Sequence, residues 1–304
     1  MRVISLFDGI GCGKLALDRA GIPVEVYDAY EIDPNPIAVC KHNHPMVIHK
    51  GDVFDAKYSR GGYDLLIGGS PCTSWAICKA GKKVNASERE TKPEGVGWDL
   101  FMQYVRALNE VQPKWFLYEN NASISKEIQD AISEQLGVKP VLINSADFSA
   151  QTRKRLYWTN IPVLPWEKNL VTFVDIMDDK YELSRSIEQY TDTIKWSQDG
   201  MQVKWDTSGK GYYSQQNRAK LPNQKFNTVV SGRAECKNNV WLGNNTIRSI
   251  TVSELEKLQT LPVGYTSCLK SKEMRGKCIG NGWTVDVVAH IFKGLRKENT
   301  NESN

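Results

Sequence analysis

Asp64-Leu-Leu-Ile-Gly-Gly-Ser-Pro-Cys72 is a short apolar run that leads into a turn and a cysteine. Residues 64–67 predict a parallel strand that is buried on both faces. The two glycines and Pro71 then favour a tight turn, which leaves Cys72 at the carboxyl end of the strand. In open α/β sheets, ligands bind at that edge. Cys72 is therefore a candidate nucleophile, although a lone cysteine is more often a buried structural residue.

Strand-like and helix-like stretches alternate on both sides of this run, from residue 2 to residue 160. We expect strands at 3–7, 24–29, 47–53, 64–67, 115–120, 141–144 and 156–159, and helices at 14–20, 36–42, 98–110 and 124–136. This alternation is typical of the α/β class, in which helices cover a mostly parallel sheet.

The alternation stops between residues 161 and 245, where no clear helix is visible. Residues 167–192 hold seven acids and three bases, whereas residues 195–245 hold eight bases and three acids with aromatic residues between them. Bases mixed with aromatic side chains suit a nucleic-acid surface, because cations attract phosphates and flat rings stack on bases. The solvated face of an ordinary small domain explains the same composition equally well.

Helical signals return near the end of the chain. Thr251-Val-Ser-Glu254 has the pattern of a capping box and predicts a helix over residues 253–259. A last helix, with apolar residues on one face, follows Gly280-Asn-Gly-Trp-Thr284. The polar tail beyond Lys297 is expected to fray.

Composition limits the class of protein. The chain has 304 residues, 40% of them hydrophobic, and a formal charge of +4, which permits nucleic-acid binding without requiring it. Its seven cysteines form no Cys-x-x-Cys pair, so neither a disulfide framework nor a metal site is expected. No apolar run is long enough to cross a membrane. We expect a cytoplasmic protein of a reducing compartment.

Two features favour a nucleoside-type cofactor. Asp8-Gly-Ile-Gly-Cys-Gly13 is a glycine turn after the first expected strand, and Glu31 at the end of the second expected strand suits a ribose diol. The G-x-G-x-G spacing differs from the G-x-G-x-x-G of most dinucleotide sites, which favours a methyl donor over a hydride carrier. Asp52 is either an acceptor for an adenine amino group or a turn acid.

Two further groups are candidates for the chemistry. Glu119 ends a strand at the same sheet edge as Cys72, where a protonated carboxyl would donate to a ring nitrogen. Gln151, Arg153 and Arg155 alternate in an extended segment and are expected on one side, either aimed at the site or as a solvated basic patch. An acid that starts a helix is the alternative for Glu119.

In this order the motifs resemble the cytosine-C5 DNA methyltransferases of bacteria and phage. The matching blocks are Phe7-Asp-Gly-Ile-Gly11, Glu31, Gly51-Asp52, Gly68-Gly-Ser-Pro-Cys72, Glu119-Asn120, Gln151-x-Arg-x-Arg155, Arg248-Ser-Ile-Thr-Val-Ser-Glu254 with Leu258-Gln259, and Gly280-Asn281. Each block alone is a weak match, but eight in family order are a strong one. The resemblance covers residues 1–160 and 246–295.

The resemblance implies a Rossmann-like S-adenosylmethionine-dependent methyltransferase sheet with a smaller, irregular target-recognition domain. The expected catalytic and cofactor-binding domain comprises residues 1–160 and 246–297. The expected target-recognition domain comprises residues 161–245, and residues 298–304 are a polar tail.

The resemblance also implies an activity, a DNA (cytosine-5-)-methyltransferase. Cys72 would attack C6 of a flipped-out cytosine, Glu119 would hold N3 and Arg155 would hold O2, with Arg153 and Gln151 in support. S-adenosylmethionine would be the cofactor, duplex DNA the partner, and the enzyme a monomer that needs neither a metal nor a membrane. It would belong to a restriction-modification system or a phage.

Further roles follow from the resemblance and from residue type. The resemblance assigns the cofactor pocket to Phe7, Gly9, Ile10, Gly11, Glu31, Asp52, Val53, Leu100, Asn281 and Trp283. Asn227-Thr-Val229 resembles the Thr-hydrophobic pair of the family's recognition domain, which gives Thr228 a place at the DNA. We expect Arg233 to read a guanine edge, and Lys204, Lys210, Lys220 and Lys225 to meet phosphates.

The chain departs from the family pattern at three points. Asn121 stands where the family has valine, Thr73-Ser-Trp75 replaces the commoner Gln-x-Phe, and the recognition segment is short. An RNA cytosine methyltransferase and a non-catalytic DNA-binding relative are the alternative functions. A dehydrogenase is the remote third.

Overall fold

The computed structural model describes residues 1–71, 74–75, 89–181, 184–211, 217–230 and 239–296. The chain forms two compact units. The first unit comprises Met1–Asn144, Lys154–Trp166 and Asp286–Asn304, and the second comprises Ser145–Arg153 and Glu167–Val285. The predicted tail at 298–304 lies outside the described residues.

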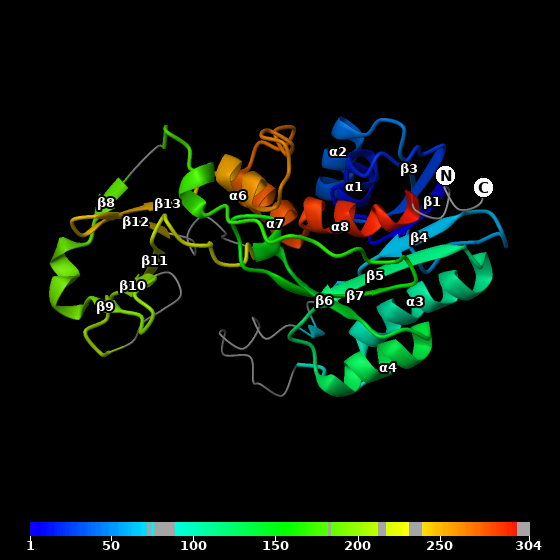
Figure 1. Ribbon diagram of the computed structural model, residues 1–304, viewed down its shortest axis with the longest axis horizontal. Coiled ribbons are helices and arrows are strands. Elements are labelled where there is room, and N and C mark those ends of the chain that lie inside the picture. Colours follow the sequence, from blue (N-terminus) through cyan, green and yellow to red (C-terminus); the bar gives the residue numbers. More distant parts are fainter. Residues whose placement is uncertain (72–73, 76–88, 182–183, 212–216, 231–238, 297–304) are drawn as a thin grey trace. The chain divides into compact units, whose positions relative to one another are not determined.

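The first unit is built on a seven-stranded sheet (Figure 1). Its strands, in the spatial order β3-β2-β1-β4-β5-β7-β6, are β3 (Ile48–Gly51), β2 (Val26–Tyr30), β1 (Arg2–Leu6), β4 (Leu65–Gly68), β5 (Trp115–Asn121), β7 (Lys154–Thr159) and β6 (Val141–Asn144). Neighbouring strands from β3 to β5 are parallel, and β7 runs antiparallel to both β5 and β6. The predicted α/β class is therefore confirmed.

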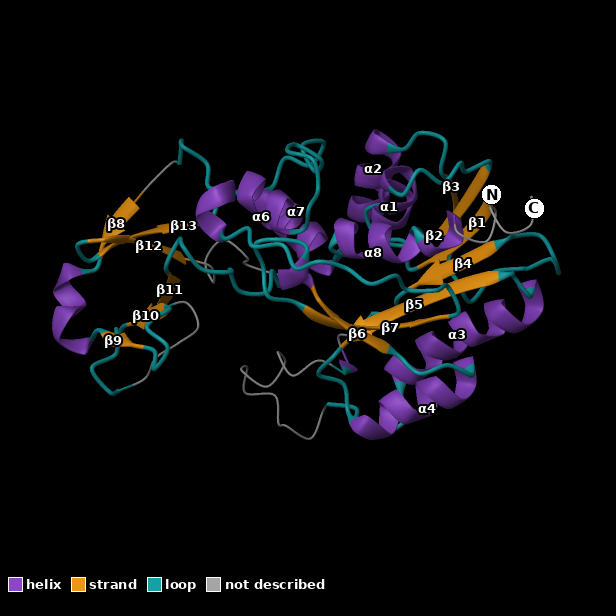
Figure 2. Ribbon diagram, in the orientation of Figure 1, coloured by secondary structure: helices purple, strands orange, loops and turns teal. Residues whose placement is uncertain are grey.

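Helices cover both faces of this sheet (Figure 2). Helices α1 (Cys12–Arg19), α2 (Pro34–Asn43) and α8 (Val285–Phe292) lie on one face, and α3 (Val96–Val111) and α4 (Lys126–Leu136) lie on the other. Local signals set the helix ends: the Asp33 carboxylate and the Ser125 hydroxyl accept N–H bonds at the starts of α2 and α4, and Gly137 in the left-handed region ends α4.

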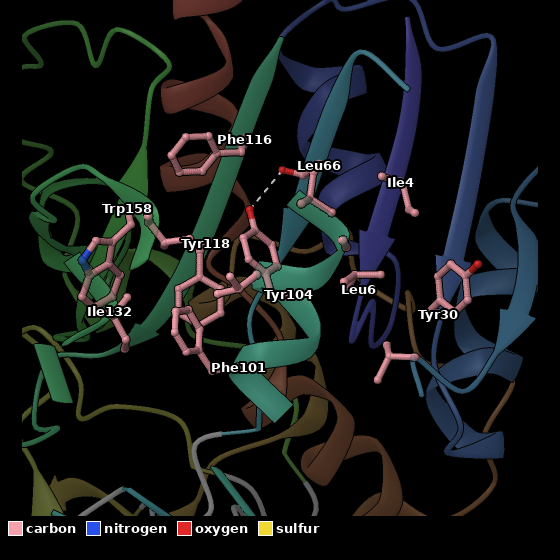
Figure 3. Close-up of a cluster of buried hydrophobic side chains, with 14 of the residues drawn as sticks. Ile4, Leu6, Tyr30, Leu66, Phe101, Tyr104, Phe116, Tyr118, Ile132 and Trp158 are labelled. Atoms are coloured by element: carbon pink, nitrogen blue, oxygen red, sulfur yellow. Dashed lines mark hydrogen bonds between the residues drawn. The ribbon is translucent and has the colours of Figure 1, made fainter. Parts of the chain in front are cut away.

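An aromatic cluster fills the space between the sheet and helices α3 and α4 (Figure 3). The Tyr118 ring of β5 is its centre, with ring centroids of Phe101, Tyr104 and Trp158 at 5.1, 4.9 and 5.8 Å. All four side chains are fully buried. Such tilted contacts allow little ring movement, so β5 is held firmly against its neighbours.

The second unit contains a six-stranded sheet that the sequence did not predict. Its strands, in spatial order, are β8 (Ser184–Ser186), β13 (Thr246–Ser249), β12 (Asn239–Gly243), β11 (Arg218–Lys220), β10 (Gln202–Lys204) and β9 (Lys195–Trp196). Strands this short show too few residues for a periodic pattern. Val203, Ala219 and Ile247 form the apolar face of the sheet and cluster with Ile187 and Trp205.

Helices α6 (Val252–Leu258) and α7 (Lys272–Asn281) complete the second unit, with 3-10 turns at Ser145–Asp147, Phe173–Ile176 and Glu188–Thr193. The predicted capping box of α6 is confirmed, since Thr251 and Glu254 each bond the other's backbone N–H. Helix α7 was not predicted, because its sequence has no apolar stripe. Strands β12 and β13 form a hairpin across residue 245, the predicted end of the recognition domain. The predicted functional domains remain a prediction.

None of the helices in the described part of the chain combines the length and the apolar character that a membrane span requires. No group of three histidine, cysteine, aspartate or glutamate side chains in the same residues is arranged to hold a metal ion.

Candidate active site

The loops after β1, β2 and β3 emerge side by side in the first unit. The three strands are parallel neighbours, and their register pairs Leu6 with Tyr30 and Tyr30 with Gly51. Phe7, Glu31 and Asp52 each follow directly on these residues. Three residues that are far apart in the sequence are thus brought to one edge of the sheet, as expected for ligand binding in this class.

The Glu31 carboxylate links the first two of these loops. Its Oε2 atom accepts a hydrogen bond from the Gly9 N–H at 3.0 Å, and its Oε1 atom accepts from the N–H groups of Ile32 and Asp33 at 2.8 and 2.9 Å. Charge-assisted bonds to backbone are strong and hold the carboxylate in one place. Three of the four lone pairs of the carboxylate are therefore used, and the one that is left, on Oε2, can accept from a ligand hydroxyl.

The backbone of the glycine turn is folded tightly and leaves room above it. Phe7, Gly9 and Gly11 have φ angles of 58°, 63° and 79°, in the left-handed region. A Cβ atom placed on Gly9 would meet nothing within 4 Å. Ile10 is buried below the turn. The open space at Gly9 fits a ligand that approaches the backbone closely.

The remaining predicted cofactor residues of the first unit lie in two places. Asp52 and Val53 follow β3, and Leu100 is half-buried in α3. The Asp52 Oδ1 atom accepts from the Phe54 N–H at 3.0 Å, which fits a turn acid and leaves its Oδ2 atom for a ligand. Ile32 is a further candidate for this site, because its apolar side chain is 69% exposed. The sequence analysis did not select it, although its position directly after Glu31 was a signal.

Asp8 was also missed, and it is buried beneath the turn. Its Oδ1 atom accepts from the Tyr27 hydroxyl at 2.7 Å and its Oδ2 atom from the Cys40 thiol at 3.6 Å. Burial raises the pKa of Asp8 to about 6, against hydrogen bonds from Ser5, Tyr27 and Cys40 that lower it.

The strand that leads to the candidate nucleophile is closely packed. A Cβ atom on Gly68, the last residue of β4, would lie 2.8 Å from the Leu6 carbonyl oxygen and 3.1 Å from the Tyr104 ring. Only glycine fits there. Ser70, two residues further on, is buried. Cys72 itself lies outside the described residues.

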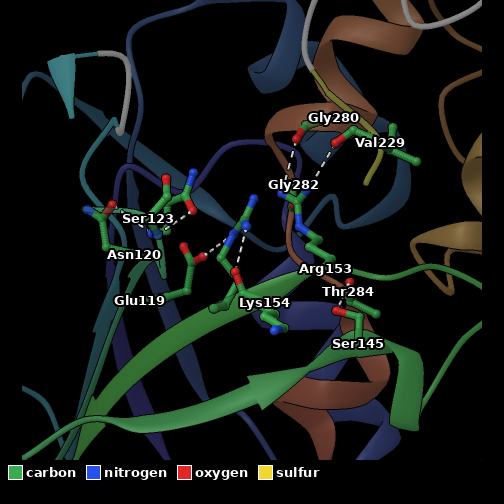
Figure 4. Close-up of polar contacts among 12 residues, drawn as sticks. Glu119, Asn120, Ser123, Ser145, Arg153, Lys154, Val229, Gly280, Gly282 and Thr284 are labelled. Atoms are coloured by element: carbon green, nitrogen blue, oxygen red, sulfur yellow. Dashed lines mark hydrogen bonds and ion pairs between the residues drawn. The ribbon is translucent and has the colours of Figure 1, made fainter. Parts of the chain in front are cut away.

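Glu119 and Arg155 form an ion pair on neighbouring strands (Figure 4). The Arg155 Nε atom lies 2.9 Å from Glu119 Oε1, and the side chains are only 12% and 13% exposed. The pair forms because antiparallel β7 places Arg155 opposite Asn121, two residues beyond Glu119. The Asn121 Oδ1 atom accepts from the Ser123 N–H at 3.0 Å, a turn contact that the family's valine lacks.

Gln151 and Arg153 belong to the second unit, where both are buried. Arg153 donates to the carbonyl oxygens of Val229, Gly280 and Gly282 at 2.7, 3.1 and 3.1 Å (Figure 4). Gln151 donates to the Leu258 carbonyl at 2.7 Å and accepts from the Val229 N–H at 3.0 Å. Neither residue is part of a solvated patch; both hold backbone segments together.

Other predicted site residues also lie in the second unit. Asn281 ends α7 and Trp283 follows it. Lys225 donates to the carbonyl oxygens of Ser149 and Asn169 at 2.9 and 2.8 Å, and burial lowers its pKa. The Thr228 hydroxyl donates to the Thr152 carbonyl. Arg233 lies outside the described residues.

Three cations lie side by side on the small sheet of the second unit. The register places Lys204 directly opposite Lys195 on one side and Arg218 on the other, and we call these three residues the basic row. The neighbours Val203 and Ala219 point to the opposite, apolar face. Within the described ranges, neither Lys204 nor Arg218 has an acidic side chain at ion-pair distance. Like charges opposite one another destabilise a sheet, so the row suits an anionic partner.

Comparison with known proteins gives a consistent result. The model of the C-5 cytosine-specific DNA methylase family matches residues 1–297. The type II methyltransferase M.FnuDI of Fusobacterium nucleatum is 25% identical over 346 aligned positions, which cover 99% of this chain and 96% of that protein. The orphan methyltransferase M.SPRI of Bacillus phage SPR is 35% identical over 170 positions, or 52% of this chain and 37% of the phage protein.

Solved structures agree on the fold. The methyltransferase EhMeth of Entamoeba histolytica has a TM-score of 0.69 to this chain at 13% identity, and 98% of each chain is covered. At this identity the likeness shows the fold alone. The predicted Rossmann-like methyltransferase fold is confirmed.

Proposed function

The chain belongs to the family of C-5 cytosine-specific DNA methylases, and from this premise we propose that it methylates C5 of a cytosine within a specific duplex DNA sequence. The observation that carries the proposal is the common sheet edge. Glu31, which bonds the backbone of the glycine turn, follows β2 at this edge. The Glu119–Arg155 ion pair lies at the same edge, where β5 meets β7. A cofactor site and a base site at one edge are what a group transfer needs.

S-adenosylmethionine, the proposed cofactor, supplies a methyl group on a positively charged sulfur. Two features of the first unit fit this cofactor: the Gly9 turn leaves open space, and the Glu31 Oε2 atom has a free lone pair for a ribose hydroxyl. Ile32 offers an exposed apolar surface to the adenine, next to Asp52 and Val53. Phe7, Gly11 and Leu100 are further proposed contacts in the first unit, and the cofactor role of Asn281 and Trp283 stays a prediction from the family resemblance.

The base chemistry is assigned to Cys72, Glu119 and Arg155. The Cys72 thiolate adds to C6 of the cytosine, and the electrons of the C5–C6 double bond shift toward N3. Glu119 donates a hydrogen bond or proton at N3, and Arg155 holds O2, so C5 becomes an enamine carbon. C5 takes the methyl group; loss of its proton then expels Cys72 and restores the ring.

The second unit is the proposed reader of DNA. A cytosine inside a duplex is out of reach of Cys72, so the base must be flipped out of the helix. The basic row is proposed to bind phosphates, which gives affinity without sequence information. Arg233 is proposed to read a guanine edge. We expect the enzyme to act in the cytoplasm as a monomer.

Bisulfite sequencing of DNA from expressing cells tests the proposal. The wild type should mark cytosines in one short motif, and Cys72→Ala should mark none while it still binds the cofactor. A duplex with 5-fluorocytosine in that motif should trap the wild type covalently, because fluorine cannot leave as a proton does. Marks made by Cys72→Ala would mean that another residue attacks. Methylated RNA beside unmethylated DNA would favour an RNA enzyme.

A further inference from the structure

We propose that the Tyr118 hydroxyl is a positioning group that holds the turn between β4 and Cys72 in place. The inference rests on the proposed role of Cys72. It concerns three buried polar residues of the first unit that the mechanism above does not use: Ser70, Tyr118 and Asn120.

The backbone ladder between β4 and β5 ends just before this turn. Its last pair is Gly68 with Tyr118, and beyond that pair the strands share no further backbone register. Ser70 is therefore joined to β5 by side chains. The Tyr118 hydroxyl lies 2.7 Å from Ser70 Oγ, and the Asn120 Nδ2 atom donates to the Ser70 carbonyl at a longer 3.4 Å.

The Tyr118 oxygen takes part in two bonds of this group. The Asn120 Nδ2 group donates to it at 3.1 Å. In its bond with Ser70 Oγ either hydroxyl can be the donor, and in both directions the bond joins Ser70 to the tyrosine ring. Burial raises the pKa of Tyr118, so the phenol stays uncharged at neutral pH.

The ring that carries the hydroxyl is itself held firmly. Phe101, Tyr104 and Trp158 surround it with centroids within 6 Å, and no part of the Tyr118 side chain is exposed (Figure 3). The hydroxyl therefore has little freedom to move, and its short bond restricts the movement of Ser70, two residues before the nucleophile. Nucleophilic attack depends steeply on such placement: an error of about 1 Å can slow a reaction about 100-fold.

A Tyr118→Phe variant tests the inference, and Tyr104→Phe is its matched control. Both changes remove one hydroxyl from the same buried cluster, but the Tyr104 hydroxyl donates to the Leu66 carbonyl within β4, at 3.3 Å, and not to Ser70. Single-turnover methyl transfer should slow about 10- to 100-fold in Tyr118→Phe and less than about threefold in Tyr104→Phe. The dissociation constants for S-adenosylmethionine and for DNA should stay near wild type in both.

A second variant approaches the bond from its other end. Ser70→Ala should slow methyl transfer as Tyr118→Phe does, and the double variant should be no slower than the slower single one, because both remove the same contact. Independent, multiplying effects would overturn the inference. The inference would also be overturned if Tyr118→Phe and Tyr104→Phe transferred methyl groups at equal rates. That result counts against it only if 5-fluorocytosine DNA traps the wild-type protein. Absence of a wild-type trap would instead count against the proposed function itself.

Discussion

Asp8 and Glu31 are carboxyl groups on adjoining loops, but one is buried and the other lies at the edge of the sheet. Glu31 accepts hydrogen bonds from three backbone N–H groups at the sheet edge, whereas Asp8 is buried beneath the glycine turn. Motif spacing predicted Glu31, because an acid at the end of the second strand has a known use. It gave no reason to single out Asp8, since burial depends on Tyr27 and Cys40, which lie on β2 and α2.

Asp8→Asn should stabilise the protein at neutral pH. Since burial raises the pKa of Asp8 from 3.8 to about 6, the folded chain keeps a proton between these values that the unfolded chain has lost. The contribution of Asp8 to the free energy of unfolding therefore falls as the pH rises from 3.8 to about 6. Above that range the charged Asp8 side chain keeps the folded state destabilised by a constant amount. Asparagine carries no charge, so we expect a gain of about 1–3 kcal/mol at pH 7.

Urea unfolding at several pH values measures this difference. His44, whose pKa burial lowers to about 4, changes stability in the opposite direction over an overlapping range. It is present in both proteins, so subtraction of the two curves removes it. A difference that stays constant from pH 4 to pH 7 would show that Asp8 does not titrate in this window.

Glu31→Ala should remove most of the stabilisation by S-adenosylmethionine. A ligand at a hundred times its dissociation constant stabilises the folded state by about 2.7 kcal/mol, and the variant loses the acceptor for the ribose hydroxyls. Thermal unfolding with and without cofactor measures the shift. Exposed Glu25→Ala, in the same unit, should keep the full shift. A shift with NAD and none with S-adenosylmethionine would overturn the cofactor assignment.

Among the elements, those of the first unit were predictable and those of the second mostly were not. Strand β4 and the first four residues of β5 are continuous apolar runs, and α4 has an apolar residue every four positions, so these elements could be predicted from their own sequences. Strand β9 has two residues and β10 has three. Strands this short are stabilised by pairing with neighbouring strands, and the partner residues are distant in the sequence.

Lys204→Gln should weaken DNA binding and slightly stabilise the fold. Lys204 lies between Lys195 and Arg218, so loss of its charge relieves repulsion across two strand pairs, worth about 0.2–1 kcal/mol each. If it binds one phosphate, the slope of log affinity against log salt should fall by about 0.9. Lys126→Gln, in an exposed pair with Asp130, is the charge-matched control and should change neither quantity in this way. Weaker DNA binding with an unchanged salt slope would contradict a phosphate contact.

At the scale of the whole molecule, the chain passes repeatedly between its two units. It leaves the first unit after Asn144, returns at Lys154, leaves again after Trp166 and returns at Asp286. The sequence predicted an inserted segment but set its end at residue 245, inside the β12–β13 hairpin. Asn244 and Asn245 form the turn of that hairpin, with left-handed φ angles of 46° and 52°. Asparagine favours such turns, so the sequence held a signal for the hairpin that the domain prediction did not use.

Exchange of the recognition segment should therefore depend on where the chain is cut. A chimera that replaces residues 167–249 with the matching segment of a relative keeps the small sheet whole and should methylate that relative's motif. The donor should have an arginine matching Arg248, because Arg248 and Glu254 form a fully buried ion pair. Replacement of residues 161–245 divides the hairpin and should lower the unfolding temperature. An active 167–249 chimera that still marks the original motif would place recognition elsewhere.

Helix α8 has a consequence for how the protein is made on the ribosome. Val287, Val288 and Ile291 of α8 are completely buried, and the helix lies on the sheet face shared with α1 and α2. All seven strands of that sheet are synthesised by residue 159, but α8 follows the second unit in the chain. The nascent sheet must therefore wait on the order of ten seconds, at ordinary rates of translation, for its last cover. Throughout that wait an apolar surface of a half-finished enzyme is open to chaperones and to other nascent chains.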